Sequence, residues 1–462
     1  MAGKIHQDEI VETSFRNPKQ LKKVLICILI VLSSGLAISQ PNWNAIKSNA
    51  TFNVADTSLY DAPFIQPVNV PGWEDGLFMT RDGMHLYSTY LPLDAFSWIT
   101  ALQANPICFD FTPYYRPPLL DIDTNTNIFG CPNFMQSDII ITGKSTPQSA
   151  FNAWSASNLR TAFSFDGGAQ GVLMNADTFD LFVYTRDGVG TQGVDIMLLR
   201  NVPVNPDTAG AVALFSTPAY EDNPHIERLN DSSLVILFDR DRYIYYSTSN
   251  DNGLTWATPQ LVADELNDQA PYDVQPHLWY DGTDWWVYFC ADNGSFVRGI
   301  YRSRQQTPGN WSNWMTKELV IEGKTITGGY GTIYGVGEPT LSTWGDLSFV
   351  VVYGDAGSSD STDRFDCDPW FLPRKGSPLT GIYQYAFEHQ EMEISYNSQL
   401  HQLYVSHFPE TTSTQWFIND VLGRTCLTGV LKNNIVIEID ALPKGYYVLN
   451  AGSSKGYSFV KY

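Results

Sequence analysis

Five polar residues recur along the chain, each directly before a proline or glycine and an apolar run: Asp75, Gln170, Asn223, Gln275 and Glu338. Asp75 and Glu338 are carboxylic acids. Two carboxyl groups held close together in a partly desolvated site can divide into a proton donor and a proton acceptor. Glycoside hydrolysis needs such a pair, about 6.5–9.5 Å apart when the reaction inverts the anomeric centre. We therefore predict that Asp75 and Glu338 are catalytic residues.

The segments that carry these residues predict an all-β fold. Each continues into a turn such as Asp82-Gly83 and then a run of β-branched and aromatic residues. The last three spacings are 53, 52 and 63 residues, about the length of a four-stranded propeller blade. The first spacing is 95 residues, which indicates an insertion near 95–135 or a sixth blade. We predict a five-bladed β-propeller over 71–390, with six blades as the alternative.

In a propeller, the innermost strand of each blade begins beside the central channel. Proline is tolerated at such a strand start, and side chains alternate between the two faces of a strand. The five polar residues should therefore ring one mouth of the channel, with Thr340 and two histidines one layer deeper. Polar lining of the channel without catalysis is the alternative. The predicted substrate-binding residues are Trp73, Gln170, Asn223, His225, Gln275 and His277.

The N-terminal 39 residues read as a secretory signal peptide. Basic residues up to Lys23 precede the short apolar run Val24–Leu32 and a stretch of small residues. A lead segment follows over 40–70. No other segment is apolar enough to span a membrane, so none is expected in the mature chain. The net charge of −21 excludes nucleic acid as a partner.

The predicted insertion carries further candidate features. Cys108 and Cys131 bracket it and are the expected disulfide, whereas Cys290 is expected to be a buried thiol. The aromatic run 109–120 predicts either a sugar-stacking wall or simple packing. Oxygen-bearing residues alternate in 121–127, which indicates calcium or a solvated turn. No other metal or cofactor is predicted.

Several segments resemble known propeller families. Ser249–Val262 resembles an Asp-box, and "WEDGLFMTRDGMHLY" and "GVGEPTLSTWGDLSFVV" resemble TolB-like repeats. Acids at blade starts resemble the five-bladed glycosidases of the arabinanase and xylosidase type, although Gln170 stands where that resemblance implies an acid. Sialidases also carry Asp-boxes, but the arginine cluster that they need is not apparent.

The last 70 residues, 391–462, predict a small Ig-like β-sandwich. "NDVLGRTC", "IEIDALPKGYYVL" and the terminal "SFVKY" resemble the C-terminal sorting domain of type IX secretion substrates in Bacteroidetes. The matching positions are Gly423, Leu442, Gly445, Tyr446 and Lys461. The resemblance implies the type IX secretion machinery as a partner and a secreted or outer-membrane cell-surface location; an ordinary accessory sandwich is the alternative.

Together these features predict an exported propeller that binds a glycan and acts as a glycoside hydrolase at the channel mouth. The alternative is a non-catalytic surface adhesin or complex-forming platform. The sequence contains no phosphate-binding loop, zinc signature or nucleotide fingerprint. The G-x-S-x-G match at 452–456 is rejected as a nucleophile elbow, because only six residues follow it and they read as a strand.

Overall fold

The computed structural model describes two folded parts, a propeller and a C-terminal sandwich. The described residues are 41–66, 68–70, 72–97, 137–159, 166–187, 193–268, 274–292, 298–324, 332–355, 358, 360–380, 393–397, 402–406, 414–420, 424–431, 435–451 and 457–461. The predicted signal peptide, Cys108, Cys131 and the segments 109–120 and 121–127 lie outside them. Within these ranges no helix is long and apolar enough to cross a membrane.

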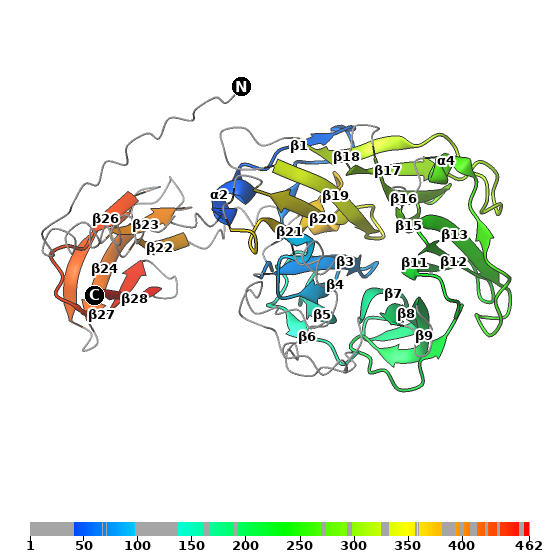
Figure 1. The fold of residues 1–462 in the computed structure, drawn as a ribbon, viewed down its shortest axis with the longest axis horizontal. Helices are drawn as coiled ribbons and strands as arrows, with labels where there is room; N and C mark the ends of the chain where they lie inside the picture. The colour runs from blue at the N-terminus through cyan, green and yellow to red at the C-terminus, as the bar shows by residue number, and fades with distance from the viewer. Residues whose placement is uncertain are drawn as a thin grey trace, which may run out of the picture.

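Antiparallel blades surround a common axis, and in each blade the strands step outward in chain order (Figure 1). The first three blades are built entirely from consecutive strands. Blade one contains β3 (Trp73–Met79), β4 (His85–Leu91), β5 (Asp138–Gly143) and β6 (Ser155–Ala156); blade two contains β7 (Asp166–Asn175), β8 (Thr178–Asp187), β9 (Val194–Pro203) and β10 (Val212–Ala213); blade three contains β11 (Glu221–Arg228), β12 (Leu234–Arg240), β13 (Tyr243–Ser249) and β14 (Gln260–Leu261).

The other two blades take strands from the N-terminal lead segment. β1 pairs antiparallel with β18 of blade four, and β2 pairs antiparallel with β21 of blade five. The chain before blade one thus supplies the outer strand of the last blade. The elements are α2 (Trp43–Ser48), β1 (Phe52–Val54), β2 (Phe64–Ile65), α4 (Asp264–Asn267), β15 (Val274–Tyr280), β16 (Trp285–Asp292), β17 (Arg298–Arg304), β18 (Glu318–Gly323), β19 (Thr332–Leu341), β20 (Leu347–Gly354), β21 (Phe365–Leu372) and the 3-10 turn η2 (Pro378–Thr380).

The innermost strands close into a ring. β3 contacts β7, β7 contacts β11, β11 contacts β15, β15 contacts β19, and β19 contacts β3 again. The predicted all-β propeller is therefore confirmed, and among the described residues the ring contains these five inner strands. Residues 92–137 connect β4 to β5 within one sheet, which is where the sequence predicted an insertion. Most of that connection lies outside the described residues.

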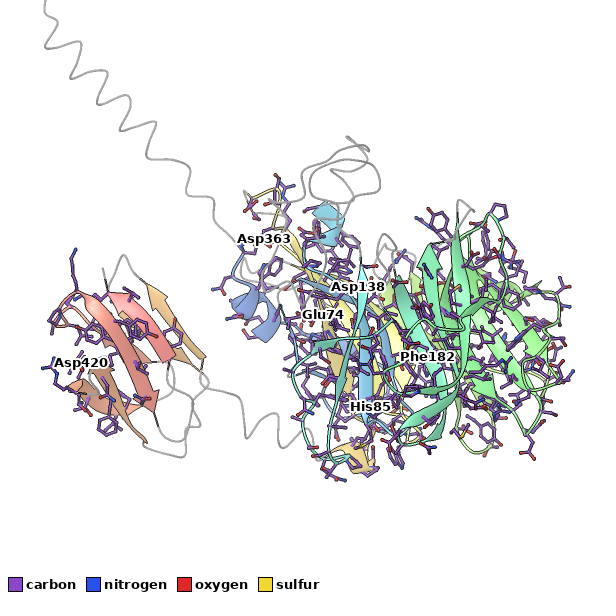
Figure 2. The ribbon with its side chains drawn as sticks, turned by 90° about the horizontal axis from the view of Figure 1, so that it is seen from below. Glu74, His85, Asp138, Phe182, Asp363 and Asp420 are labelled. Carbon is purple, nitrogen blue, oxygen red and sulfur yellow. The ribbon has the colours of Figure 1, made fainter. Side chains whose placement is uncertain are left out.

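Apolar side chains from facing blades fill the space between sheets. The middle strands carry long runs of buried aliphatic and aromatic residues, as expected for sheets covered on both faces. Between blades one and two, the ring centroids of Tyr87 and Phe182 lie 5.8 Å apart. Phe182 lies within the packed side chains of the propeller in Figure 2. This packing is what holds the inner strands at fixed positions around the channel.

The lead segment is anchored by a buried ion cluster. Lys47, in α2, places its Nζ 2.8 Å from carboxylate oxygens of both Asp366 and Asp368 on β21. Asp368 is fully buried. A buried carboxylate without its cationic partner would be costly, so the lead segment is an integral part of blade five.

The C-terminal part is a sandwich of two antiparallel sheets, β22-β23-β26 and β25-β24-β27-β28. Residues of both sheets share one core, which includes Leu403, Trp416 and Ile437. Buried Lys461 donates from Nζ to the carbonyl oxygens of residues 439, 440 and 442 at 2.7–2.8 Å. The predicted sandwich is confirmed, with strands β22 (Glu393–Asn397), β23 (Gln402–Ser406), β24 (Thr414–Asp420), β25 (Thr425–Leu431), β26 (Ile435–Glu438), β27 (Gly445–Ala451) and β28 (Tyr457–Lys461).

Candidate functional site

Every innermost strand carries a β-bulge at the same point, where the pairing with the second strand skips two residues. One residue in each bulge has a positive φ of 48–63°. In blades three to five that residue is not glycine, which is uncommon and costs conformational energy. Bulge residues leave the hydrogen-bonded ladder, so the following Pro224, Pro276 and Pro339 cost no ladder bond. The five left-handed residues are Gly76, Gly168, Asn223, Gln275 and Glu338.

The bulges correct the sequence alignment in the first two blades. Asp75 precedes the bulge residue Gly76, so its structural equivalent in blade three is Asp222. Gln170 follows the bulge residue of blade two by two positions, which places it level with His225. Strand alternation cannot reveal a bulge, because the extra residue shifts all later side chains to the opposite face. Gln170 therefore leaves the predicted mouth ring.

Four carboxyl groups gather at the mouth of the channel, and we call them the mouth layer: Asp75, Asp222, Asp239 and Glu338. The sequence analysis predicted only the first and the last as site acids. Asp239 lies on β12 directly opposite Asp222 in the blade-three hairpin. The turn at 229–233 joins β11 to β12 and sets their register, but the bulge shifts Asp222 by one position onto Asp239, so the sequence alone does not reveal this pairing.

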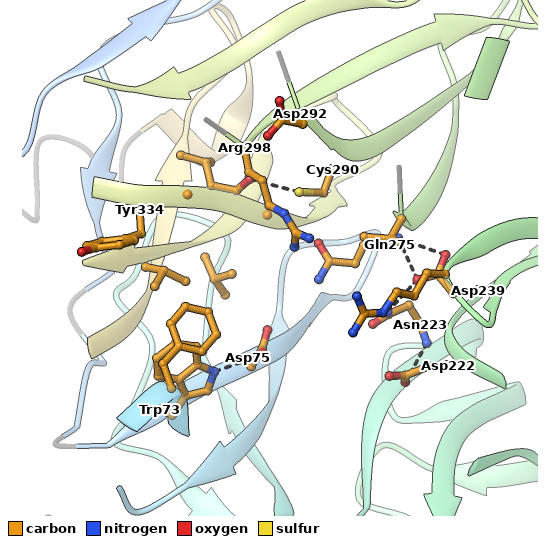
Figure 3. A pocket seen from close by; sticks show the side chains of 18 of the residues that line it. Trp73, Asp75, Asp222, Asn223, Asp239, Gln275, Cys290, Asp292, Arg298 and Tyr334 are labelled. Carbon is orange, nitrogen blue, oxygen red and sulfur yellow. Dashed lines mark hydrogen bonds between the residues drawn. The ribbon is translucent and has the colours of Figure 1, made fainter. Parts of the chain in front are cut away.

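Asn223 and Gln275, both predicted ligand-binding residues, connect these acids (Figure 3). Asn223 donates from Nδ2 to Asp239 at 2.8 Å, and the Gln275 backbone N–H donates to both oxygens of Asp239 at 3.0 and 3.2 Å. The side-chain amide of Gln275 donates to Glu338 Oε1, and its Oε1 accepts the Glu338 backbone N–H at 3.1 Å. The two amides therefore fix the orientation of two acids that would otherwise repel each other.

Burial favours the protonated forms of three of these acids. Burial raises the pKa of Glu338 well above its usual value, and the nearby Asp75 carboxyl adds to the rise. Burial likewise raises the pKa of Asp239 well above its usual value, although hydrogen bonds from Gln275 and Asn223 oppose it. Burial also raises the pKa of Asp222. Glu338 is thus suited to donate a proton at neutral pH.

Asp75 and Glu338 are closer together than the sequence analysis expected. Their carboxyl groups lie within hydrogen-bonding reach of each other. Asp75 is held by Trp73 Nε1 at 3.1 Å and by its neighbour's backbone N–H at 2.9 Å. Carboxyl groups this close leave no room for a water or a sugar ring between them, so Asp75 and Glu338 do not have the separation that was predicted for a catalytic pair.

A cavity of about 840 Å³ opens above the mouth layer, and we call it the large lobe. Phe96 and Tyr334 line one wall, and each packs edge-on against Phe365 at centroid distances of 5.4 and 5.0 Å. Trp73 packs behind Phe96 at 4.7 Å and is itself buried, so it supports the wall and orients Asp75. Phe96, Tyr220 and Tyr334 are each at least 40% exposed and were not predicted.

A second cavity of about 240 Å³ adjoins the first, and we call it the small lobe. Asp75 and Asp222 line both lobes, whereas Glu338 lines the small lobe and not the large one. Below the small lobe the channel narrows between the bulge residues and the prolines that follow them.

The predicted ligand-binding histidines lie beyond this constriction, in what we call the deep layer: Gln170, His225, His277 and Thr340. Both histidines are buried, their rings are 3.9 Å apart, and His277 Nε2 accepts the Leu341 backbone N–H at 3.0 Å. Neither lines the large or the small lobe. That they bind substrate stays a prediction, and in this structure they are packed against each other below the two lobes.

Burial and nearby charges set the protonation states of the two deep-layer histidines and of the adjacent Glu227. Burial lowers the pKa of His225 and, together with the nearby His225, lowers that of His277 well below its usual value. Although burial opposes it, Arg81 and His225 hold the pKa of Glu227 at about 2. The two imidazoles are thus neutral beside an Arg81–Glu227 ion pair. Among the described residues, no group of three or more His, Cys, Asp or Glu is arranged to hold a metal ion.

Comparison with known proteins gives similarity in architecture only. No protein-family model matches the sequence, and no curated protein is significantly similar to it. The chain is similar in structure to the catalytic domain of the GH62 α-L-arabinofuranosidase of Coprinopsis cinerea, with 10% identity over 70% of this chain and 99% of that one and a TM-score of 0.40. It is also similar to the GH43 endo-arabinanase of Bacillus licheniformis (10% identity, 72% and 98% covered, TM-score 0.38) and to a putative hydrolase of Bacteroides ovatus (10% identity, 76% and 99% covered, TM-score 0.39). Because these TM-scores are below 0.5, the function is inferred from the mouth layer itself.

Proposed function

We propose that the protein binds a glycan in the large lobe and hydrolyses a glycosidic bond at the mouth layer. The observation that carries this proposal is the gathering of Asp75, Asp222 and Glu338 at the base of an aromatic-lined cavity, where burial raises the pKa of Glu338 well above its usual value. Aromatic rings such as Tyr334 bury the apolar faces of sugar rings well. Acids with raised pKa values beside them can supply and accept protons near neutral pH.

The proposed reaction assigns a separate task to each acid. Glu338, whose pKa is raised, gives its proton to the oxygen of the leaving sugar as the bond between that oxygen and the anomeric carbon breaks. Asp222 takes a proton from the attacking water, whose oxygen forms the new bond to the anomeric carbon. Asn223 and Gln275 keep the surrounding acids in place through their hydrogen bonds.

The test is a hydrolysis screen of the purified chain on linear arabinan, xylan and galactan, read as released reducing sugar. We expect at least one polymer to be cleaved, and Glu338→Gln to lower the rate by about 10²-fold or more. Glu318→Gln, the same change on the outer strand β18, is the matched control and should keep the wild-type rate. Equal rates for Glu338→Gln and the wild type would remove Glu338 from the mechanism.

A second candidate function is that of a non-catalytic glycan-binding adhesin or platform. The observation that favours it is the Gln275 side chain, whose amide already occupies one oxygen of the Glu338 carboxyl group. A protein that binds one of the screened polymers but cleaves none of them would support this candidate over the hydrolase.

We further propose that the chain is exported and that its sandwich addresses it to the cell surface. The resemblance of the N-terminal 39 residues to a signal peptide, and of 391–462 to a sorting domain, supports this proposal. Cell fractionation with and without residues 391–462 tests it. Retention of both forms inside the cell would contradict the proposal.

A further inference from the structure

We infer that the site releases single sugar residues from the end of a glycan chain, with the terminal residue held in the small lobe. The inference rests on the proposed hydrolase function and goes beyond it by naming the kind of bond that is cut. It follows from the sizes, linings and shared residues of the two lobes.

The small lobe exists because blade two presents no side chain at its bulge. Where blade three has Asp222-Asn223 and blade five has Gly337-Glu338, blade two has Gly167-Gly168. A Cβ atom at Gly168 would lie 3.1 Å from Thr185 Oγ1 and 3.3 Å from Pro224 Cδ. Any larger side chain there would enter the space between blades one and three. Gly167 and Gly168 thus contribute no side chains to the ring of bulge residues. The space that such side chains would fill stays open.

The lining of the small lobe suits one sugar. Hydroxyl groups of Thr89, Ser137 and Thr185 and the carboxyl group of Asp166 surround it, in contrast to the aromatic wall of the large lobe. Hydroxyl and carboxyl groups match the many hydroxyls of one sugar, whereas aromatic faces suit successive rings of a chain. A space of about 240 Å³ corresponds to roughly eight water molecules, enough for one monosaccharide and too little for two.

The position of the acids sets the position of the cut. Asp75 and Asp222 line both lobes and therefore lie at their junction. Glu338 lines the small lobe but not the large one. A glycan that crosses the junction would thus present to the acids the bond between its terminal residue and the next one. Hydrolysis at that bond frees one monosaccharide and leaves the shortened chain on the aromatic wall.

The experiment follows the products of the wild-type chain and of Gly168→Asn on linear arabinan, xylan and galactan, each in native and dye-cross-linked form. Asparagine is chosen because Asn223 has a φ of 48° at the equivalent position, which shows that this residue type fits the bulge, and a urea unfolding curve of the variant measures the strain that the new Cβ adds. Gly210→Asn is the matched control, since Gly210 also has a positive φ, of 80°, and open space around it. Chromatography gives product length, and polymer titration gives affinity.

We expect the wild type to release only monosaccharide at the first time points and no dye from the cross-linked polymers. Gly168→Asn should lower the rate at least about tenfold while polymer affinity is unchanged, because the large lobe is intact. Oligosaccharides of mixed length from the wild type, or an unchanged rate in Gly168→Asn, would overturn the inference alone. Binding without any product from the wild type would overturn the hydrolase proposal and this inference with it.

Discussion

The mouth layer and the deep layer are two groups of polar residues at successive levels of the channel, yet their chemistry differs. In the mouth layer, acids crowd together beside a cavity, and burial raises the pKa of Glu338. In the deep layer, His277 accepts a backbone N–H and Glu227 is paired with Arg81, although among the described residues Nδ1 of both histidines and Oε1 of Gln170 have no hydrogen-bond partner. Acids that stay close together beside open space point to function, whereas a buried layer that lines neither lobe points to packing and stability.

The largest expected effect tests the mouth layer. Asp222→Asn removes the proposed base but keeps the shape of the side chain, so we expect the hydrolysis rate to fall by about 10²–10⁴-fold. The melting temperature should stay the same or rise, because a carboxyl group crowded by Asp75 is lost. Initial rates and a thermal scan measure both. Asp231→Asn, in an exposed turn of the same blade, should change neither.

A smaller effect is expected from a change in the deep layer, and it should fall on stability and not on activity. His277→Ala leaves the buried Leu341 N–H without its acceptor, which should cost about 1–3 kcal/mol in the free energy of unfolding. Urea unfolding measures this cost, and the rate per folded molecule should not change. His277→Gln offers a new acceptor and should recover part of the stability. A larger loss of activity than of stability in His277→Ala would break the contrast between the layers.

The smallest expected effect is a difference in pH dependence. Because the pKa of Glu338 is raised, its stabilising contribution is complete below about pH 4.5 and is lost as pH rises through the folded-state pKa. The deep layer acts in the opposite sense. Glu227, with a pKa of about 2, stabilises the folded state at pH values above its usual pKa, and this contribution is lost as the pH falls towards 2. His277 also destabilises the folded state as the pH falls, because burial opposes its protonation. Comparison with Glu338→Gln isolates the first contribution.

We expect the wild type to gain stability relative to Glu338→Gln as the pH is lowered from 8 to 5, read as the difference between their melting temperatures. The deep-layer contribution is common to both proteins and cancels in that difference. A difference that does not change with pH would show that Glu338 titrates as an ordinary exposed acid.

Much of the propeller could be predicted from sequence, because each blade repeats a local signal. Turns such as Asp82-Gly83 and runs of β-branched and aromatic residues mark strands wherever they occur, and their spacing gave five blades. Glu338, Asn223 and Gln275 were placed at the mouth because proline follows each of them. Gln170 was misplaced, since no proline marks the bulge of blade two and the sequence alone does not locate an extra strand residue.

The sequence by itself determined which residues repeat, which strands they start and that acids occur among them, because these features depend on neighbours along the chain. Only the tertiary structure decided which acids meet. Asp75, Asp222 and Glu338 come from three different blades, and their separation depends on how the ring closes. The small lobe is also a tertiary feature, since a pair of glycines becomes a cavity only when side chains from other blades surround it.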